Sequence, residues 1–187
     1  MIQRPGELWV VRHADTDWSN IGRHTGRTNI PLSRGGRETP AALRERLQGQ
    51  AWDLVHTSPL ERARDTCRLA GFEGAERDEL VEWDYGSYEG ETTPQIRERR
   101  PDWDLWRHGA PGGEDAAAVG RRVDRLLGSL PDDAGKVVIF SHGHVLRVLA
   151  ARWLGLAPEH GALFALAPGG IGVLGWERER RVMRSWG

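Results

Sequence analysis

Two histidines follow short apolar runs at opposite ends of the chain. His13 comes after residues 8–11 and Arg12, and His142 comes at the end of the run 137–141. Apolar runs of this length are typical of buried parallel strands, and the carboxyl ends of such strands meet at one edge of an α/β sheet, where ligands bind. We therefore expect both histidines to face one pocket, which Arg12 makes suitable for an anion. The alternative is that each histidine only caps its strand.

The elements that must position these histidines alternate along the chain. We expect strands at residues 8–11, 53–57, 79–81 and 137–141, helices at 33–47, 58–69, 93–99, 102–106, 114–130 and 144–154, and a terminal hairpin from 171–176 and 182–186. Ser33 and Ser58 are the expected N-caps of the first two helices, and Pro59 is expected at the first position of the second. Pro40 falls inside the first helix, where proline costs about 3 kcal/mol or kinks the helix. Strands that alternate with helices predict an α/β fold.

The composition is that of an ordinary globular enzyme. A chain of 187 residues with 39% hydrophobic content is able to bury a single core. Its net charge of -1 argues against a nucleic acid partner. Cys67 is the single cysteine, which excludes an intrachain disulfide and a thiolate metal cluster. Residues 1–6 contain no apolar run, and no apolar stretch reaches membrane-spanning length, so we expect a cytoplasmic protein without a membrane partner.

Further segments extend the pattern around the two histidines. They are RHADTDWS (12–19), GRHTG (22–26), IPLS (30–33), SPLERARDT (58–66), LVEWDYG (80–86) and SHGH (141–144). In order and spacing these segments resemble the histidine phosphatase superfamily, which includes the cofactor-dependent phosphoglycerate mutases. Residues 82–90 and 101–103 are most similar to the branch of actinobacterial acid phosphatases and, more distantly, fungal sedoheptulose bisphosphatase. The resemblance implies a single histidine phosphatase domain over residues 1–187, folded as a three-layer sandwich with a mostly parallel central sheet flanked by helices.

The resemblance also implies roles for five residues, without a metal or a cofactor. His13 is the implied nucleophile, since a neutral imidazole is not repelled by a phosphate dianion and forms phosphohistidine. Its other ring nitrogen is expected to donate to a backbone carbonyl, which fixes the tautomer. Arg12 and Arg62 are the implied phosphoryl clamps, with a protonated His142 as third partner. Glu82 is the implied acid that protonates the leaving alkoxide and then activates water.

Substrate contacts are expected from Arg12, Ser19, Arg23, Thr25, Gly26, Arg62, Gly143 and His144. Aromatic side chains are expected at the rim of the pocket: Trp83, Tyr85, Tyr88, Trp103 and Trp106. Three alternatives stay open. Arg64 or Arg68 is able to replace Arg62, Glu89 is able to replace Glu82, and His142 with His144 is able to bind a metal, although no carboxylate or cysteine cluster accompanies them. No catalytic role is expected for His24, His56, His108 or His160.

Two positions depart from the family pattern. Ala14 stands where glycine is usual, which requires a negative φ there. Ser19 stands where the mutases carry asparagine, so a hydroxyl replaces an amide donor. Ser19 and the short chain favour a phosphomonoesterase acting on a small phosphorylated metabolite, with sugar phosphates as the expected class. A cofactor-dependent phosphoglycerate mutase is the runner-up and an inactive phosphoprotein-binding module the third interpretation. A homodimer is compatible with the sequence.

Overall fold

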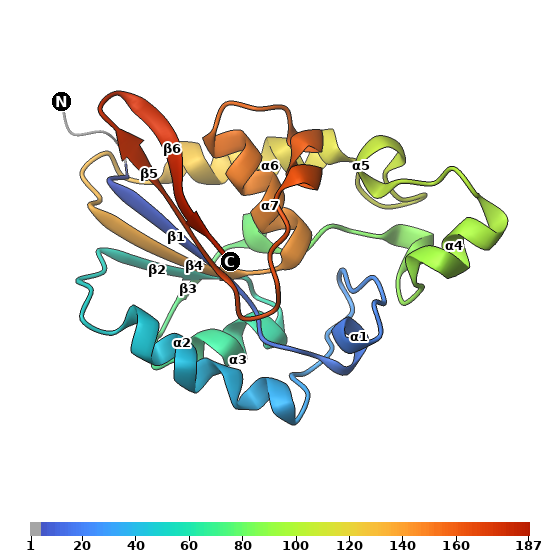
Figure 1. Cartoon of the computed structure of the whole chain (residues 1–187), viewed down its shortest axis with the longest axis horizontal. Helices are drawn as coiled ribbons and strands as arrows, with labels where there is room; N and C mark the ends of the chain where they lie inside the picture. Colours follow the sequence, from blue (N-terminus) through green and yellow to red (C-terminus); the bar gives the residue numbers. More distant parts are fainter. Residues whose placement is uncertain (1–4) are drawn as a thin grey trace.

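The computed structural model describes residues 5–187, which form one six-stranded sheet with helices on both faces (Figure 1). The strand order is β3-β2-β4-β1-β5-β6. Strands β1 to β4 are parallel to one another, and β5 runs antiparallel to both β1 and β6. Their bounds are β1 Glu7–Arg12, β2 Leu54–Thr57, β3 Ala75–Glu76, β4 Lys136–Ser141, β5 Ile171–Glu177 and β6 Arg180–Trp186. The mostly parallel sheet between two helical layers confirms the expected fold class.

The helices divide between the two faces of the sheet, α2 and α3 on one side and α6 and α7 on the other (Figure 1). The short helices α1, α4 and α5 lie beyond the carboxyl ends of β1 and β4. The α-helices are α1 Asp17–Asn20, α2 Thr39–Leu47, α3 Glu61–Leu69, α4 Thr93–Arg99, α5 Leu105–His108, α6 Ala116–Ser129 and α7 Gly143–Trp153. The 3-10 helices are η1 Gly35–Arg37, η2 Asp78–Leu80, η3 Gly86–Tyr88 and η4 Pro158–Leu163.

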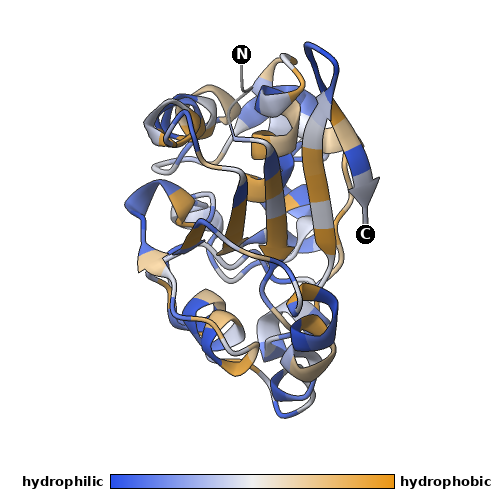
Figure 2. Ribbon diagram, turned by 90° about the vertical axis from the view of Figure 1, so that its left-hand side faces the viewer, coloured by the Kyte–Doolittle hydropathy of each residue, from blue (hydrophilic) through white to orange (hydrophobic). Residues whose placement is uncertain are grey.

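Strands β1 and β4 are buried on both faces because their side chains alternate between two cores. Val11 and Phe140 pack with α2 and α3, whereas Val10 and Ile139 pack with α6 and α7. This burial explains the unbroken apolar runs that both strands show in the sequence, which appear in orange at the centre of Figure 2. The register pairs Arg12 with Ser141, so both strands end at the same level.

The predicted continuous helix from Ser33 was wrong, and Pro40 is the reason. The chain forms η1 first, in which the N–H of Gly36 donates to the Ser33 hydroxyl (3.0 Å). Helix α2 then starts at Thr39, which places Pro40 in its first turn. Proline is tolerated there because the first N–H groups of a helix have no partner within the helix.

Two other expectations were wrong. Residues 79–81 form no strand, since 78–80 make η2, and the edge strand β3 lies just before them. Ser58 does not cap α3, which begins at Glu61, and Pro59 therefore lies before the helix rather than at its first position. The other expected elements are present, with ends that differ by a few residues; α6, for example, begins after the N-cap Asp115.

Residues 1–4, which belong to the segment 1–6 without an apolar run, lie outside the described residues. Within the described part, no helix combines the length and the apolar character needed to cross a membrane.

Candidate active site

His13 follows β1 and has one ring nitrogen already engaged. Its Nδ1 lies 2.7 Å from the carbonyl oxygen of Ala14, and because a carbonyl only accepts, Nδ1 carries the proton. Burial lowers the pKa of His13 well below its ordinary value, and the charges of Arg62 and Arg12 lower it further. The imidazole is therefore neutral, and Nε2 keeps its lone pair. This is the tautomer that the sequence analysis expected.

His142 follows β4 and lies beside His13, with 5.2 Å between the ring centroids. Its Nε2 lies 2.8 Å from the hydroxyl of Ser58, and its Nδ1 is buried without a partner. Burial lowers the pKa of His142 well below its ordinary value, and Arg62 and His13 lower it further. Burial next to arginines therefore disfavours a charged His142 in the absence of an anion, and the expected protonation of His142 beside a bound phosphate stays a prediction.

Arg12 and Arg62 are both held by backbone carbonyls. Arg12 Nη1 donates to Leu166 O (2.6 Å), and Arg62 donates through Nη1 to Thr28 O (3.0 Å) and through Nη2 to Gly26 O (2.9 Å). The Nε atoms of both arginines are buried without a hydrogen-bond partner. Neither guanidinium has a carboxylate partner among residues 5–187, so their charges are available to an anion.

The structure separates Arg62 from its two rivals. The side chain of Arg62 is completely buried, whereas Arg64 and Arg68 lie on the exposed face of α3. Arg64 pairs with Glu76 (3.3 Å) and Arg68 with Asp65 (3.1 Å). Only Arg62 therefore points toward the two histidines, as its effect on their pKa values also indicates.

Glu82 and Glu89 also differ in their surroundings. The Glu82 carboxyl lines the pocket and accepts hydrogen bonds from three backbone N–H groups, those of Trp83 (2.9 Å), His144 (3.0 Å) and Val145 (2.9 Å). Glu89 instead accepts from the backbone of residues 26 and 28 and so fixes the loop before α3. Glu89 therefore stabilises the loop before α3, whereas Glu82 lines the same cavity as His13.

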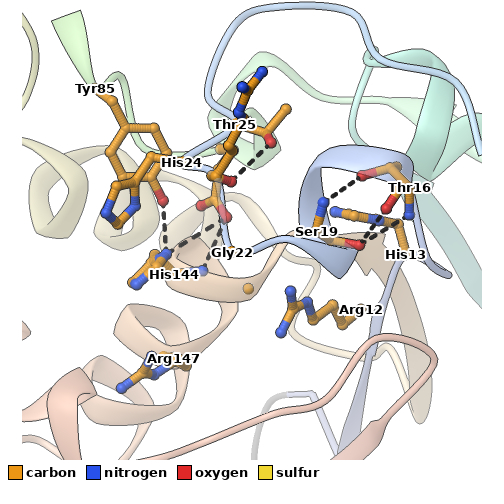
Figure 3. Close-up of a pocket in the computed structure, with 13 residues that line it drawn as sticks. Arg12, His13, Thr16, Ser19, Gly22, His24, Thr25, Tyr85, His144 and Arg147 are labelled. Carbon is orange, nitrogen blue, oxygen red and sulfur yellow. Dashed lines mark hydrogen bonds and ion pairs between the residues drawn. The ribbon is translucent and has the colours of Figure 1, made fainter. Parts of the chain in front are cut away.

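A cavity of about 170 Å³ opens above the two strand ends (Figure 3). Five of the expected substrate contacts beside Arg12 line it: Ser19, Arg23, Thr25, Gly143 and His144. Arg62 and His142 lie behind this wall in the protein interior. Gly26 does not line the cavity, and its N–H is taken by the Glu89 carboxylate. The other lining residues are His13, Thr16, Gly22, His24, Glu82, Tyr85 and Arg147.

Four residues that line the pocket were not predicted from the sequence: Thr16, Gly22, His24 and Arg147. The His24 ring stacks on Tyr85 with 4.8 Å between centroids, and its Nε2 lies 3.1 Å from the Thr93 hydroxyl. Burial lowers the pKa of His24 to about 4, so this ring is neutral near pH 7. The position of His24 between Arg23 and Thr25 was the signal available in the sequence.

The predicted aromatic rim was wrong for Tyr88 and Trp106, which do not line the cavity, and for the indoles of Trp83 and Trp103. Both indoles are almost fully buried in the core, where their Nε1 atoms donate to Glu114 O (2.8 Å) and Gly109 O (3.0 Å). Tyr85 does line the pocket, and its hydroxyl lies 2.6 Å from Nδ1 of His144. The wall opposite Arg12 is therefore built from Tyr85 and two neutral imidazoles.

Both departures from the family pattern fit the local geometry. Ala14 has no positive φ, and its N–H donates to the Thr66 hydroxyl (3.1 Å). Ser19 forms a capping box with Thr16 at the start of α1, in which the Thr16 N–H donates to the Ser19 hydroxyl (2.9 Å). Ser19 thus holds the short helix that borders the pocket.

Residues 5–187 contain no group of three or more histidine, cysteine, aspartate or glutamate side chains arranged to hold a metal ion. Nδ1 of His144 lies within hydrogen-bond distance of the Tyr85 hydroxyl. The His144 ring also packs against the Trp106 indole, with 5.4 Å between the ring centroids. The donor set of the pocket suits an anion rather than a cation, because its guanidinium and N–H groups only donate.

Comparisons with known proteins agree with this geometry. A family model of the histidine phosphatase superfamily (branch 1) matches residues 8–187. The chain is 44% identical over 180 residues to an acid phosphatase of Mycobacterium tuberculosis, covering 93% of this chain and 88% of that protein. It is 32% identical over 184 residues to sedoheptulose 1,7-bisphosphatase of Saccharomyces cerevisiae, covering 80% of this chain and 68% of that protein.

Among solved structures, the product of a Mycobacterium tuberculosis open reading frame superposes with a TM-score of 0.91 at 40% identity, over 98% of both chains. Sequence, fold and the position of the paired histidines thus indicate the same family. The chain belongs to the histidine phosphatase superfamily, branch 1, and is a phosphomonoester hydrolase of that family.

Proposed function

We propose that this phosphatase hydrolyses small phosphorylated metabolites, sugar phosphates in particular, without a metal and through a phosphohistidine on His13. The observation that carries the proposal is the 2.7 Å contact between His13 Nδ1 and the carbonyl of Ala14. It places the lone pair on Nε2 of a ring that burial keeps neutral. Such a nitrogen attacks phosphorus without charge repulsion and divides hydrolysis into two easier transfers.

Three buried N–H groups near His13 support the binding of the phosphoryl group. They are Nε of Arg12, Nε of Arg62 and Nδ1 of His142, and none of them has a hydrogen-bond partner among residues 5–187. A buried donor without a partner costs about 1–3 kcal/mol, which an oxygen of the phosphoryl group would recover. Arginine charges also stabilise the spread of negative charge over these oxygens in the transition state.

The Ser58 hydroxyl gives His142 the tautomer that this role needs. Its oxygen accepts from the Leu60 N–H (3.3 Å), so its own proton is free to be donated to Nε2 of His142 (2.8 Å). The proton of the neutral ring then resides on Nδ1, the atom without a partner. A neutral His142 is therefore a hydrogen-bond donor to the phosphoryl group, and protonation is not required.

Glu82 is the proposed proton donor to the leaving alkoxide and the proposed base for the attacking water. Its Oε1 accepts from two backbone N–H groups and its Oε2 from one, which fixes the carboxyl and leaves Oε2 with acceptor capacity toward the pocket. A fixed carboxyl next to the bond that breaks supplies a proton in the first transfer and removes one in the second.

The proposed substrate class rests on the size and lining of the cavity and on the relatives. A space of about 170 Å³ suits a compact molecule, and the hydroxyl and imidazole groups of Thr25, His24 and His144 suit a polyhydroxylated one. One relative is named as a bisphosphatase of a sugar, which points to the same class.

Labelling of the intermediate tests the proposal. Brief incubation with a radiolabelled phosphomonoester, followed by quenching, is expected to give an acid-labile, alkali-stable label on the wild-type protein and none on His13→Ala. The exposed His160→Ala variant serves as the matched control and should keep the label. The experiment is run with and without a strong chelator, and label that persists in His13→Ala or vanishes with the chelator would contradict the proposal.

A further inference from the structure

Arg147 is a fixed cation in the wall of the pocket. Its Nε donates to Gly161 O (3.0 Å) and its Nη2 to Ala162 O (2.9 Å), both in η4. The guanidinium carbon lies 4.7 Å from the centroid of the Trp106 ring, on which it stacks. These contacts hold the guanidinium in place before any ligand arrives, so little side-chain entropy remains to be lost on binding.

Arg147 has no acidic partner. None of the ion pairs among residues 5–187 includes it, and its Nη1 makes no hydrogen bond there. Burial lowers the pKa of Arg147 below its ordinary value, which reflects the loss of water around the charge. The attraction of Glu82 offsets part of this effect, but a partly buried cation without an ion-pair partner is unfavourable for stability, and such groups are typical of binding sites.

The place of Arg147 in the pocket is distinct from that of the phosphoryl clamps. In Figure 3, Arg147 and His13 are well separated, and Arg12 lies between them in that view. Arg12 and Arg62 surround the nucleophile, whereas Arg147 lies beyond His144, one helical turn further along α7. A phosphoryl group at His13 therefore leaves Arg147 to the other end of a compact substrate.

We propose that Arg147 binds a second anionic group, phosphoryl or carboxylate, on the alcohol part of the substrate. The inference rests on the proposed function, in which the first phosphoryl group occupies the site of His13. It deepens that function by selecting phosphorylated metabolites with two anionic ends. A guanidinium is suited to this task because it presents several N–H donors in one plane to the oxygens of either group.

The structural alternative is that Arg147 only fastens η4 to α7. The two carbonyl contacts and the stacking on Trp106 explain Nε and Nη2. They do not explain why the side chain lines the cavity with Nη1 unpaired. The two interpretations differ in a measurable way, because a fastening role affects all substrates alike, whereas an anion-binding role affects only those with a second anionic group.

Three phosphate esters of one carbon chain separate these cases: butanediol monophosphate, butanediol bisphosphate and the phosphate ester of hydroxybutanoate. We expect the wild-type enzyme to have the higher kcat/KM for the two esters with a second anion. Arg147→Gln is expected to lower kcat/KM for these by about ten- to a hundredfold, the range for a lost hydrogen bond to a charged group. Its kcat/KM for the monophosphate should stay close to wild type, and Arg147→Lys should retain part of the preference.

Arg152→Gln is the matched control, since Arg152 lies on the same helix but pairs with Asp124 at the surface (2.8 Å). A wild-type enzyme without preference, or an equal loss for all three esters in a folded Arg147→Gln, would overturn the inference. If the wild-type kcat/KM exceeds that for the monophosphate with only the bisphosphate or only the carboxylate ester, that ester identifies the second anionic group. Failure of the proposed function is read separately, as the absence of labelled His13 with nitrophenyl phosphate, whose leaving group carries no second anion.

Discussion

At the scale of single residues, the carboxyl of Glu82 accepts its hydrogen bonds from backbone N–H groups, and its Oε2 also lies 3.9 Å from Nδ1 of His144. The N–H groups of Trp83, His144 and Val145 fix both oxygens, so no neighbouring side chain has to move for the carboxyl to act. Two of these donors belong to the start of α7, directly after His142, and the third follows Glu82 itself. The proposed acid and the proposed phosphoryl site therefore share one backbone segment.

Replacement of Glu82 by glutamine tests the acid through the leaving group. A sugar alkoxide is strongly basic and needs the proton, whereas nitrophenolate leaves with little help. Glu82→Gln should therefore lose about a hundredfold or more in single-turnover rate with a sugar phosphate, and far less in the phosphorylation step with nitrophenyl phosphate. The matched control is Glu89→Gln, which removes a carboxylate that accepts loop N–H groups. Equal losses for both leaving groups in Glu82→Gln would assign the proton to another residue.

The sequence predicted the central residues of the site better than its walls. His13, Arg12 and Glu82 were accessible to prediction because each stands in a short segment whose order and spacing carry the pattern. Arg147 was not, because its position depends on carbonyls of η4 that are distant in the sequence. Trp83 shows the opposite error, since a large aromatic next to an active carboxyl equally suits a core, and only packing decides between core and rim.

At the scale of elements, the segment that carries Glu82 depends on α6. Arg122 donates to Glu79 O (2.7 Å) and Glu82 O (3.2 Å) and forms an ion pair with Glu114 (2.9 Å). Glu114 in turn accepts from the Asp84 N–H (3.0 Å). The pair is mostly removed from water, with 10% and 18% of the two side chains exposed. The segment from Glu79 to Asp84, whose only regular structure is part of η2, is thus held at both ends.

Removal of one member of this ion pair should lower both the stability of the fold and the ability of Glu82 to act as the proposed proton donor. Arg122→Gln leaves Glu114 buried without its partner, which is expected to lower the free energy of unfolding by about 3 kcal/mol. The shift of Glu82 should also reduce turnover of sugar phosphates more than that of nitrophenyl phosphate. Urea unfolding and the two assays measure these effects, with the exposed Arg125→Gln on the same helix as control. An equal fall for both substrates would limit Arg122 to a structural role.

Element prediction succeeded where one face of an element is apolar and failed where a local contact decided the outcome. Helix α6 was recognisable because Val119, Val123 and Leu126 recur on one buried face. The start of α3 was not, since Ser58 has the side chain of an N-cap but contacts His142 instead. A hydroxyl serves equally well in either place, and the choice is tertiary.

At the scale of the whole molecule, five histidines are held in the uncharged form by burial. His13, His24, His56, His142 and His144 all have a lowered pKa, and burial is the largest cause for each of them. In the unfolded chain the same side chains have a pKa of about 6.5. Between that pH and the folded pKa, the unfolded chain binds more protons than the native protein.

Stability is therefore expected to be greatest above pH 6.5, the ordinary pKa of histidine, and to fall as the pH drops below it. Each histidine contributes a slope of up to about 1.4 kcal/mol per pH unit, and for His24 the window extends down to about 4. Urea unfolding between neutral and acidic pH measures the slope. His24→Gln should make it shallower, with the exposed His160→Gln as control. A free energy of unfolding that is constant across this range would contradict the burial of these rings.

The pairing of β1 with β4 also has a consequence for biosynthesis. The strand that precedes the proposed nucleophile is synthesised long before its central neighbour β4. Contacts between residues so distant in the sequence form slowly, because a large loop must close before they are gained. Until β4 is in place, His13 has neither a dry surrounding nor His142 beside it. A nascent or truncated polypeptide that ends before β4 is therefore expected to lack phosphatase activity, because the proposed nucleophile is not yet enclosed in its site.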